Sequence, residues 1–377
     1  MSCYDAIVLG TGGVGSAALF HLTRRGLRVL GIDRFSPGHD RGSSHGETRI
    51  IRQAYFEHPD YVPLLLRAYE LWAELEALSG QQLFHQAGLL QVGPRNGAVV
   101  SGVLHSAKLH GLKVEELTAA EAQRRFTGFV VPPELSGVFE PRAGYLLVEK
   151  CVLAHLQAAK NAGAEHLPET EVVSWNASGD EVVVATNRGE FHAARLIISP
   201  GPWAGEMLAS LKVPLEVRRK HVYWFSPTAA EYAASSGCPT FLYELPEGVF
   251  YGFPSLAPHG LKAAEHSGGE LVTDPANDPR SENAADRERV TRFLSQYLPG
   301  VSRLASRHSV CFYTMTPDEH FIVDRHPDHP NVAFATGLSG HGFKFTGVLG
   351  EVLADLAIEG NTKLPIAFLG MRLFGEF

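Results

Sequence analysis

Residues 6–15, Ala6-Ile7-Val8-Leu9-Gly10-Thr11-Gly12-Gly13-Val14-Gly15, join a continuous apolar run to a glycine-rich loop. Such an apolar run is typical of a strand buried on both faces of a parallel sheet. Apolar residues then recur at helical spacing over residues 16–25, and Gly26 is a suitable residue to end a helix. Residues 28–33 form a second apolar stretch. The chain therefore opens with a βαβ unit.

The loop has the spacing G-x-G-x-x-G, which is weak evidence alone but stronger between a strand and a helix. Gly10 allows the tight turn, Gly12 lets the backbone approach a pyrophosphate, and Gly15 allows close helix–strand packing. The helix N-terminus favours phosphate. Asp33 would accept hydrogen bonds from the adenosine ribose, which favours FAD or NAD over NADP. The motif does not separate FAD from NAD.

Length and charge set limits on the rest. The chain has 377 residues, enough for two interleaved domains, and a formal net charge of -8. This charge argues against nucleic acid or an anionic membrane as the main partner. No apolar run is long enough to span a membrane, and strand residues begin too early for a signal peptide. The four widely spaced cysteines suggest a reducing compartment, so we expect a cytoplasmic protein.

Further elements follow from periodicity. The sequence predicts helices over 61–79, 147–163, 285–298 and 346–358, and strands over 171–175, 181–186, 190–192, 195–199 and 332–336. Residues 81–145 are mixed and strand-rich, and residues 214–272 alternate as strands with turns. The pattern predicts a nucleotide domain assembled from N-terminal, middle and C-terminal pieces, with a β-rich domain inserted twice.

The polar segment 42–52, Gly42-Ser43-Ser44-His45-Gly46-Glu47-Thr48-Arg49-Ile50-Ile51-Arg52, lies between apolar elements. Arg49 and Arg52 are three residues apart and would face the same side of a helical turn. A guanidinium suits a carboxylate or the edge of a flavin pyrimidine ring. From the spacing alone, a solvated basic loop with a structural salt bridge explains the segment equally well.

Two C-terminal features also carry chemistry. Cys311 lies in His308-Ser309-Val310-Cys311-Phe312-Tyr313, although most cysteines in such runs are small buried hydrophobes. The loop 337–342 precedes the last predicted helix, so its backbone N–H groups could stabilise an anion, and Lys344 adds a positive charge. The alternative for this loop is a structural turn beside a surface lysine.

Together, segments 42–52, 308–324 and 337–345 resemble the monomeric sarcosine oxidase family, which includes N-methyltryptophan oxidases and belongs to the D-amino-acid-oxidase-like superfamily. The resemblance covers nearly the whole chain. It implies an α/β fold with a Rossmann-like FAD-binding domain and an inserted antiparallel β-sheet substrate domain. We expect the FAD-binding domain at 1–80, 145–213 and 305–377, and the substrate domain at 81–144 and 214–304.

The resemblance also implies site residues. Arg52 and Lys344 would bind the substrate carboxylate, and Leu242 would shape the side-chain pocket. Tyr251, His266 and Tyr313 would face the substrate, and Lys262 would speed electron transfer to O₂. Besides Gly10, Gly12 and Gly15 of the first loop and Asp33 after the second strand, the implied cofactor-binding residues are Ser43, His45, Thr48, Arg49, Cys311, Gly340, Gly342 and Lys344. Cys311 would bond covalently to a flavin methyl group. No metal ligands are predicted.

The expected activity is oxidation of a secondary amino acid, such as sarcosine, another N-methyl amino acid, proline or pipecolate. A hydride equivalent would pass to FAD, and O₂ would become H₂O₂. The alternatives are an FAD-dependent amino-acid or 2-hydroxy-acid dehydrogenase with another electron acceptor, an NAD dehydrogenase, and a flavin-binding protein without turnover. Segments 42–52 and 337–345 would have no role in the NAD enzyme. By the same resemblance we expect a monomer whose ligands are a small amino acid and O₂.

Overall fold

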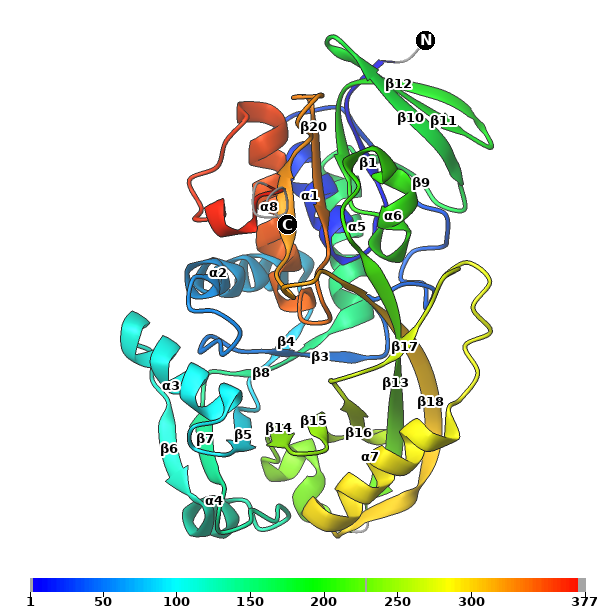
Figure 1. Ribbon diagram of the computed structural model, residues 1–377. Helices are drawn as coiled ribbons and strands as arrows, with labels where there is room; N and C mark the ends of the chain where they lie inside the picture. The colour runs from blue at the N-terminus through cyan, green and yellow to red at the C-terminus, as the bar shows by residue number, and fades with distance from the viewer. Residues whose placement is uncertain (1–2, 228, 372–377) are drawn as a thin grey trace.

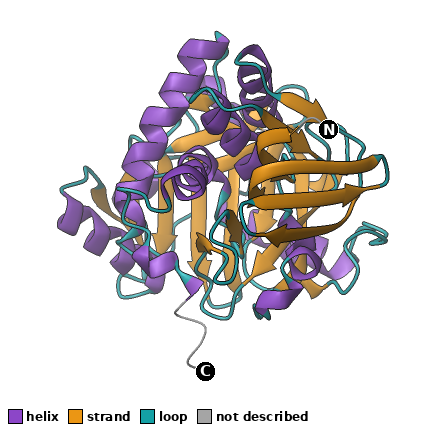
Figure 2. Cartoon of the chain, turned by 90° about the horizontal axis from the view of Figure 1, so that it is seen from above, coloured by secondary structure: helices purple, strands orange, loops and turns teal. Residues whose placement is uncertain are grey.

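The computed structural model describes residues 3–227 and 229–371. It confirms the expected α/β class and contains one mixed sheet, one large, mostly antiparallel sheet and one short sheet. The short sheet crosses between the two larger ones in Figure 1. Seen from above, the strands run through the middle of the molecule and helices lie around them (Figure 2).

The eight-stranded sheet holds the first βαβ unit, with β1 (Cys3–Leu9) parallel to both β2 (Val29–Ile32) and β12 (Gly189–Ile198). Its other strands are β9 (Glu165–Leu167), β10 (Val172–Ser178), β11 (Glu181–Thr186), β19 (Ile322–Arg325) and β20 (Val332–Thr336). The prediction of separate strands at 190–192 and 195–199 is wrong. Residues 189–198 form one strand because no turn residue interrupts them. Along one edge β12 changes partner from antiparallel β11 to parallel β20, and its other edge pairs with parallel β1.

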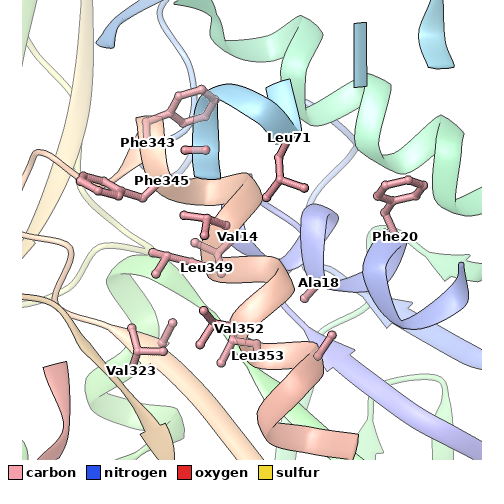
Figure 3. Close-up of a cluster of buried hydrophobic side chains, with 14 of the residues drawn as sticks. Val14, Ala18, Phe20, Leu71, Val323, Phe343, Phe345, Leu349, Val352 and Leu353 are labelled. Carbon is pink, nitrogen blue, oxygen red and sulfur yellow. The ribbon is translucent and has the colours of Figure 1, made fainter. Parts of the chain in front are cut away.

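Helices from distant parts of the chain pack against this sheet and one another. They are α1 (Gly13–Thr23), α2 (Tyr61–Ser79), α5 (Val148–Asn161) and α8 (Thr346–Glu359), with the short α6 (Ala204–Met207) nearby. Figure 3 shows Val14 and Ala18 of α1 beside Leu349, Val352 and Leu353 of α8. This buried contact joins the first and last helices, and so holds the N-terminal and C-terminal loops together.

The nine-stranded sheet forms the other half of the molecule. Its strands are β5 (Leu89–Gly93), β6 (Glu115–Thr118), β7 (Ser136–Glu140), β13 (Glu216–Pro227), β14 (Thr240–Leu245), β15 (Gly248–Leu256), β16 (Gly260–Glu265), β17 (Glu270–Leu271) and β18 (Val301–Met315). Its helices are α3 (Ala98–His110), α4 (Ala119–Arg125) and α7 (Ala284–Tyr297). Residues 305–315 are thus hydrogen-bonded, within β18, to β13. The domain division expected from the sequence stays a proposal.

The three-stranded sheet consists of β3 (Thr48–Ile51), β4 (Phe84–His85) and β8 (Gly144–Leu147). Single 3-10 turns complete the described elements: η1 (Gly201–Trp203), η2 (Ala209–Leu211), η3 (Ala230–Tyr232), η4 (Ala234–Ser236), η5 (Phe343–Phe345) and η6 (Ala367–Leu369). Because β3 belongs to this bridging sheet, the polar segment 42–52 lies between the two larger sheets (Figure 1).

We predict that Gly350→Ala destabilises the fold by about 1–3 kcal/mol, through overpacking of α1 against α8. A Cβ at Gly350 would lie 2.6 Å from both Ala17 Cβ and the Ala18 backbone nitrogen. The matched control is Gly347→Ala in the same helix, where the nearest atom would be Leu71 Cβ at 3.6 Å. We expect the control to be neutral or stabilising, because alanine favours helix. Thermal unfolding of both variants tests this, and equal stability would contradict the packing argument.

Candidate active site

A long groove begins at the glycine-rich loop. It has a volume of about 210 Å³ and runs from the first βαβ unit towards β18 and the C-terminal loop. Its lining includes these predicted cofactor residues: Gly10, Gly12, Asp33, Ser43, Arg49, Gly340 and Gly342. Gly15 lies beneath the loop, outside the lining residues. Segments predicted to hold a dinucleotide therefore meet around one groove.

The glycines have the geometry that the motif requires. Gly10 has φ +78°, and a Cβ there would lie 2.6 Å from the carbonyl oxygen of Ser199. A Cβ on Gly15 would lie 1.7 Å from the Gly10 oxygen, so only glycine permits this helix–strand contact. At Gly12 the nearest atom is Ser44 Oγ at 3.8 Å, which leaves room for a ligand. Gly12 has no side chain to cap α1, and Ser44 Oγ accepts a hydrogen bond from Gly13 N at 3.2 Å, so a phosphate at this helix N-terminus would lie beside Ser44.

Asp33 directly follows β2 and is buried in the groove wall. Its Oδ2 accepts hydrogen bonds from Thr11 N (2.7 Å) and Thr11 Oγ1 (3.1 Å), and its Oδ1 accepts one from Phe35 N (2.9 Å). An ionised carboxylate has about four acceptor positions, so one remains for a ribose hydroxyl. These bonds fix the carboxylate in the orientation that the prediction needs.

Cys311 lies near the opposite end, on β18, and its side chain is buried. Arg49 Nη2 donates to its Sγ at 3.1 Å. Burial raises the pKa of the thiol, but His45, Arg49 and Lys262 outweigh burial and lower this pKa to about 6. A thiolate at neutral pH is the nucleophilic form. By contrast, burial among apolar groups raises the pKa of the Cys238 thiol to about 12.

The surroundings of Cys311 fit a bound cofactor. His45 is buried, and its Nε2 has no hydrogen-bond partner among the described residues, although buried polar atoms are normally paired. Ser43 Oγ donates to Phe312 O at 2.6 Å and ties the polar loop to β18. Gly340, with φ +79°, has no room for a Cβ because the Tyr313 ring would lie 2.3 Å away. Residues from three distant segments thus meet beside one thiol.

Lys262 is buried behind this polar loop. Its Nζ donates to Gly46 O (2.6 Å), Thr48 O (2.8 Å) and Thr48 Oγ1 (3.3 Å). Burial, and then the charge of Arg49, lower the pKa of Lys262 well below its usual range. Lys262 and Thr48 are not among the lining residues of the groove. They therefore act on a bound ligand only indirectly, by holding the backbone of the polar loop in place.

A smaller cavity of about 50 Å³ adjoins the groove. Its lining comprises Arg49, Ile50, Arg52, Phe56, Glu57, Leu242, Tyr251, His266, Tyr313, Gly340, His341, Phe343 and Lys344. Four of these residues, Arg49, Tyr313, Gly340 and Phe343, also line the groove. A ligand in the small cavity would therefore contact the inner end of a ligand in the groove. The six residues predicted to contact the substrate all line this cavity, whereas Lys262 does not: Arg52, Leu242, Tyr251, His266, Tyr313 and Lys344.

Two cations dominate the small cavity. Arg52 is buried, lies 4.5 Å from the ring centres of both Tyr55 and Phe56, and its Nη2 donates to both Glu57 carboxylate oxygens at 2.5 Å. Lys344 Nζ donates to His341 O at 2.5 Å and to Tyr55 Oη at 3.4 Å. Among the described residues, no carboxylate oxygen lies within 4 Å of Lys344 Nζ. Burial, and then the charge of Arg52, lower the pKa of Lys344 well below its usual range.

The expectation that Arg49 and Arg52 lie on one helical turn is wrong. Arg49 is in β3 and Arg52 directly follows this strand, because Ile50 and Ile51 favour extended backbone. Residues three apart on a strand point to opposite faces. The two arginines still line one cavity, since the regular strand ends at residue 51.

His266, Tyr251 and Tyr313 form the polar wall of the cavity. His266 Nδ1 and Tyr313 Oη are 3.3 Å apart, and the Tyr251 and His266 rings are 6.1 Å apart. Burial, and then Lys220, lower the pKa of His266 to about 3. This imidazole is therefore neutral at physiological pH and exchanges hydrogen bonds without adding charge. Leu242 faces Tyr251 across the β14–β15 pair.

Some residues of the site were not found from the sequence. Glu57 holds Arg52, Tyr55 Oη lies 2.5 Å from His341 Nδ1, and Lys220 influences His266. The sequence could have indicated Glu57, because it is an acidic residue only five positions after the candidate binding residue Arg52. Tyr55 and His341 are 286 positions apart, and no local pattern indicates their contact.

The groove at the glycine-rich loop and the adjoining cavity with two basic side chains have the arrangement expected of a dinucleotide-dependent oxidoreductase. Residues 5–356 match the family described as FAD dependent oxidoreductase, and the chain belongs to this family. FAD is therefore its cofactor, which resolves the choice that the glycine motif left open.

Known relatives agree with this assignment. The chain is 40% identical over 374 residues to a monomeric sarcosine oxidase from Bacillus sp. strain NS-129, covering 98% of this chain and 96% of that protein. It is 39% identical over 376 residues to an N-methyl-L-tryptophan oxidase from Yersinia pestis strain Pestoides F, covering 98% and 99%. The fold is similar to that of L-proline dehydrogenase from P. horikoshii, with a TM-score of 0.84, 23% identity, and 98% and 97% coverage.

We predict that Glu57 contributes to stability only above acidic pH. Burial raises the pKa of Glu57, but Arg52, His341 and Lys344 together lower it from 4.5 to about 2. Because the folded pKa is depressed, the stabilisation is present above pH 4.5 and is lost as pH falls towards 2. The stability difference between wild type and Glu57→Gln should therefore shrink over this range in urea unfolding. A stability difference for Glu57→Gln that stays constant over this range would contradict the assignment.

Proposed function

We propose that this protein is an FAD-dependent oxidase of small secondary amino acids, with sarcosine, other N-methyl amino acids, proline and pipecolate as candidate substrates. The observation that carries the proposal is the small cavity, in which Arg52 and Lys344 face the same space that opens onto the groove at Arg49 and Tyr313. Two cations suit one carboxylate. A carboxylate bound there would direct the amine end of an amino acid towards the groove.

The polar wall fits an amine substrate. A neutral His266 and the two tyrosine hydroxyls offer hydrogen bonds to an uncharged amine without a competing positive charge. The relatives named for sarcosine and N-methyl-L-tryptophan support a secondary amine. The cavity of about 50 Å³, with Leu242 and Phe56 in its wall, favours a small substituent on the α-carbon.

When bound, FAD supplies the two-electron acceptor, which takes a hydride equivalent from the carbon next to nitrogen and passes the electrons to O₂ to give H₂O₂. The residues of the chain hold the substrate carboxylate, orient the amine and exclude water from the cavity. The resulting imine needs only water to hydrolyse. No side chain has to be assigned as a general base if the amine binds uncharged.

We also propose that Cys311 bonds covalently to the flavin. The lowered pKa of its thiol, the cations beside it and the unpaired Nε2 of His45 support an attacking thiolate at this position. His45 and Arg49 would then lie over the flavin, as the family resemblance implies.

The electron acceptor separates the two candidate functions. The family resemblance supports O₂ by assigning Lys262 to electron transfer to O₂, although here Lys262 Nζ lies behind the polar loop and holds the carbonyls of Gly46 and Thr48. The similar fold of an enzyme named L-proline dehydrogenase keeps a dehydrogenase with another acceptor as the second candidate. The described helices include none long and apolar enough to cross a membrane. We further propose a monomeric, cytoplasmic enzyme, and the name of the sarcosine oxidase relative supports the monomer.

Replacing Cys311 with alanine should release the flavin. After acid precipitation, we expect the yellow colour in the pellet for wild type and in the supernatant for Cys311→Ala. Cys238→Ala is the matched control, since it removes another buried thiol and should keep the colour in the pellet. Yellow wild-type supernatant would refute the covalent bond, and a protein purified without any flavin would refute the cofactor site itself.

Arg52→Met and Lys344→Met should each raise the KM for the best secondary amino acid about 10- to 100-fold, because each removes charge-assisted hydrogen bonds to the carboxylate. H₂O₂ release at varied substrate concentration measures this. The control is Arg95→Met, an exposed arginine paired with Glu116 at 2.9 Å, which should leave KM unchanged. Flavin bleaching without oxygen but no H₂O₂ in air would favour the dehydrogenase. No bleaching by any secondary amino acid would exclude the proposed function.

A further inference from the structure

A buried carboxylate outside the cavity holds the backbone that carries Arg52. Glu140, the last residue of β7, is 1% exposed. Its Oε1 accepts a hydrogen bond from Gln53 N at 2.6 Å, and its Oε2 accepts one from Ala54 N at 3.1 Å. Among the described residues, no basic side-chain nitrogen lies within 4 Å of this carboxylate. Its two oxygens are therefore directed to consecutive backbone amides rather than to an ion pair.

These amides belong to the segment that forms one side of the cavity. Residues 52–57 lie between β3 and α2 without helix or strand structure, so their backbone groups lack regular partners. Arg52, Phe56 and Glu57 line the cavity directly. A third bond holds the same segment, since Ser106 Oγ of α3 donates to Tyr55 O at 2.5 Å. All three bonds come from the half of the molecule built on the nine-stranded sheet.

The consequence for Arg52 is geometric. Among the described residues, its guanidinium pairs with Glu57 and lies over the rings of Tyr55 and Phe56, all of which belong to the same segment. The direction of the guanidinium therefore depends on the position of the 52–57 backbone. Lys344, the other cation, belongs to η5, the 3-10 turn before α8. The two cations can face one carboxylate only if segment 52–57 keeps its place relative to η5.

We propose that Glu140 is a positioning residue for substrate carboxylate binding: by holding the Gln53 and Ala54 amides, it places Arg52 opposite Lys344. This inference rests on the proposed function in that it takes Arg52 and Lys344 as the carboxylate site. Glu140 itself does not line the cavity and does not touch the substrate.

The charges around Glu140 give the proposal a pH signature. Burial raises the pKa of Glu140 to about 7, although the hydrogen bonds from Gln53 and Ala54 and the charges of Arg52 and Arg142 lower it in part. Tyr69 of α2 also faces Glu140, but burial raises the pKa of Tyr69 well above its usual range. Protonation of Glu140 removes the ionised acceptor, so carboxylate binding should weaken as pH falls through about 7. Loss of the Lys344 charge would act oppositely, weakening binding as pH rises.

The test compares Glu140→Gln with Glu76→Gln in the flavin-loaded protein. Glutamine keeps the size of the side chain but can offer an acceptor oxygen to only one of the two amides. Glu76 is a control for loss of charge alone, because its Oε1 accepts both backbone bonds, from Leu83 N (2.7 Å) and Phe84 N (2.9 Å), and a glutamine oxygen can keep both; neither residue lines the cavity. The probe is methoxyacetate, a small carboxylate without an amine, titrated by calorimetry between pH 6 and 8.5. KM, kcat and thermal stability are measured alongside.

For Glu140→Gln we expect the affinity for methoxyacetate to fall about 10-fold and KM to rise about 10-fold, with a smaller change in kcat. The affinity of this variant should also no longer decrease below pH 7, as that of wild type does. Glu76→Gln should show neither effect, because its backbone bonds remain. Unchanged carboxylate affinity in Glu140→Gln, or an equal loss in Glu76→Gln, would overturn the positioning role and leave the proposed function standing. Wild type that binds no carboxylate would overturn both.

Discussion

The site depends on one constraint: its buried basic side chains outnumber the carboxylates that could pair with them. Arg52, Lys262 and Lys344 are buried between the two large sheets. Burial of an ion is costly unless it is hydrogen-bonded or paired. Glu57 pairs with Arg52, whereas Lys262 and Lys344 are held by backbone carbonyls and hydroxyls. This excess of cations makes an anionic ligand favourable, and a carboxylate substrate and a reduced flavin are both anions.

The architecture keeps these charges in place through contacts between distant segments. The α1–α8 contact sets the C-terminal loop beside the glycine-rich loop. Strand β3 brings the polar loop between the sheets, where Ser43 is tied to β18 and Lys262 holds its carbonyls. The positions of the charged side chains are thus set more by hydrogen bonds to the backbone than by ion pairs between side chains. The cavity walls come from the nine-stranded sheet, from β3 of the short sheet, and from the segments 52–57 and 340–344, so no single sheet would form the site.

Local patterns were sufficient for much of this fold. The helix predicted at 61–79 matches α2, and that at 346–358 ends one residue before α8 does, because both have strong apolar stripes and Gly80 or Gly360 as a helix end. Helices α3 and α4 were not resolved within residues 81–145, and the arginine spacing was assigned to a helix although β-branched residues favoured a strand. Contacts such as Glu140 with Gln53 depend on chain topology, which periodicity does not reveal.

Strand β18 places Cys311 and Tyr313 two residues apart, so both side chains point to one face of a single strand paired along β13. If the proposed bond to the flavin forms at Cys311, the cofactor and one wall of the small cavity share a rigid support. Leu242, by contrast, comes from β14, a separate strand of the same sheet. Under the proposed function, substitutions on β14 would therefore change which side chains the substrate can carry while the cofactor keeps its place, so substrate range and redox chemistry could evolve separately.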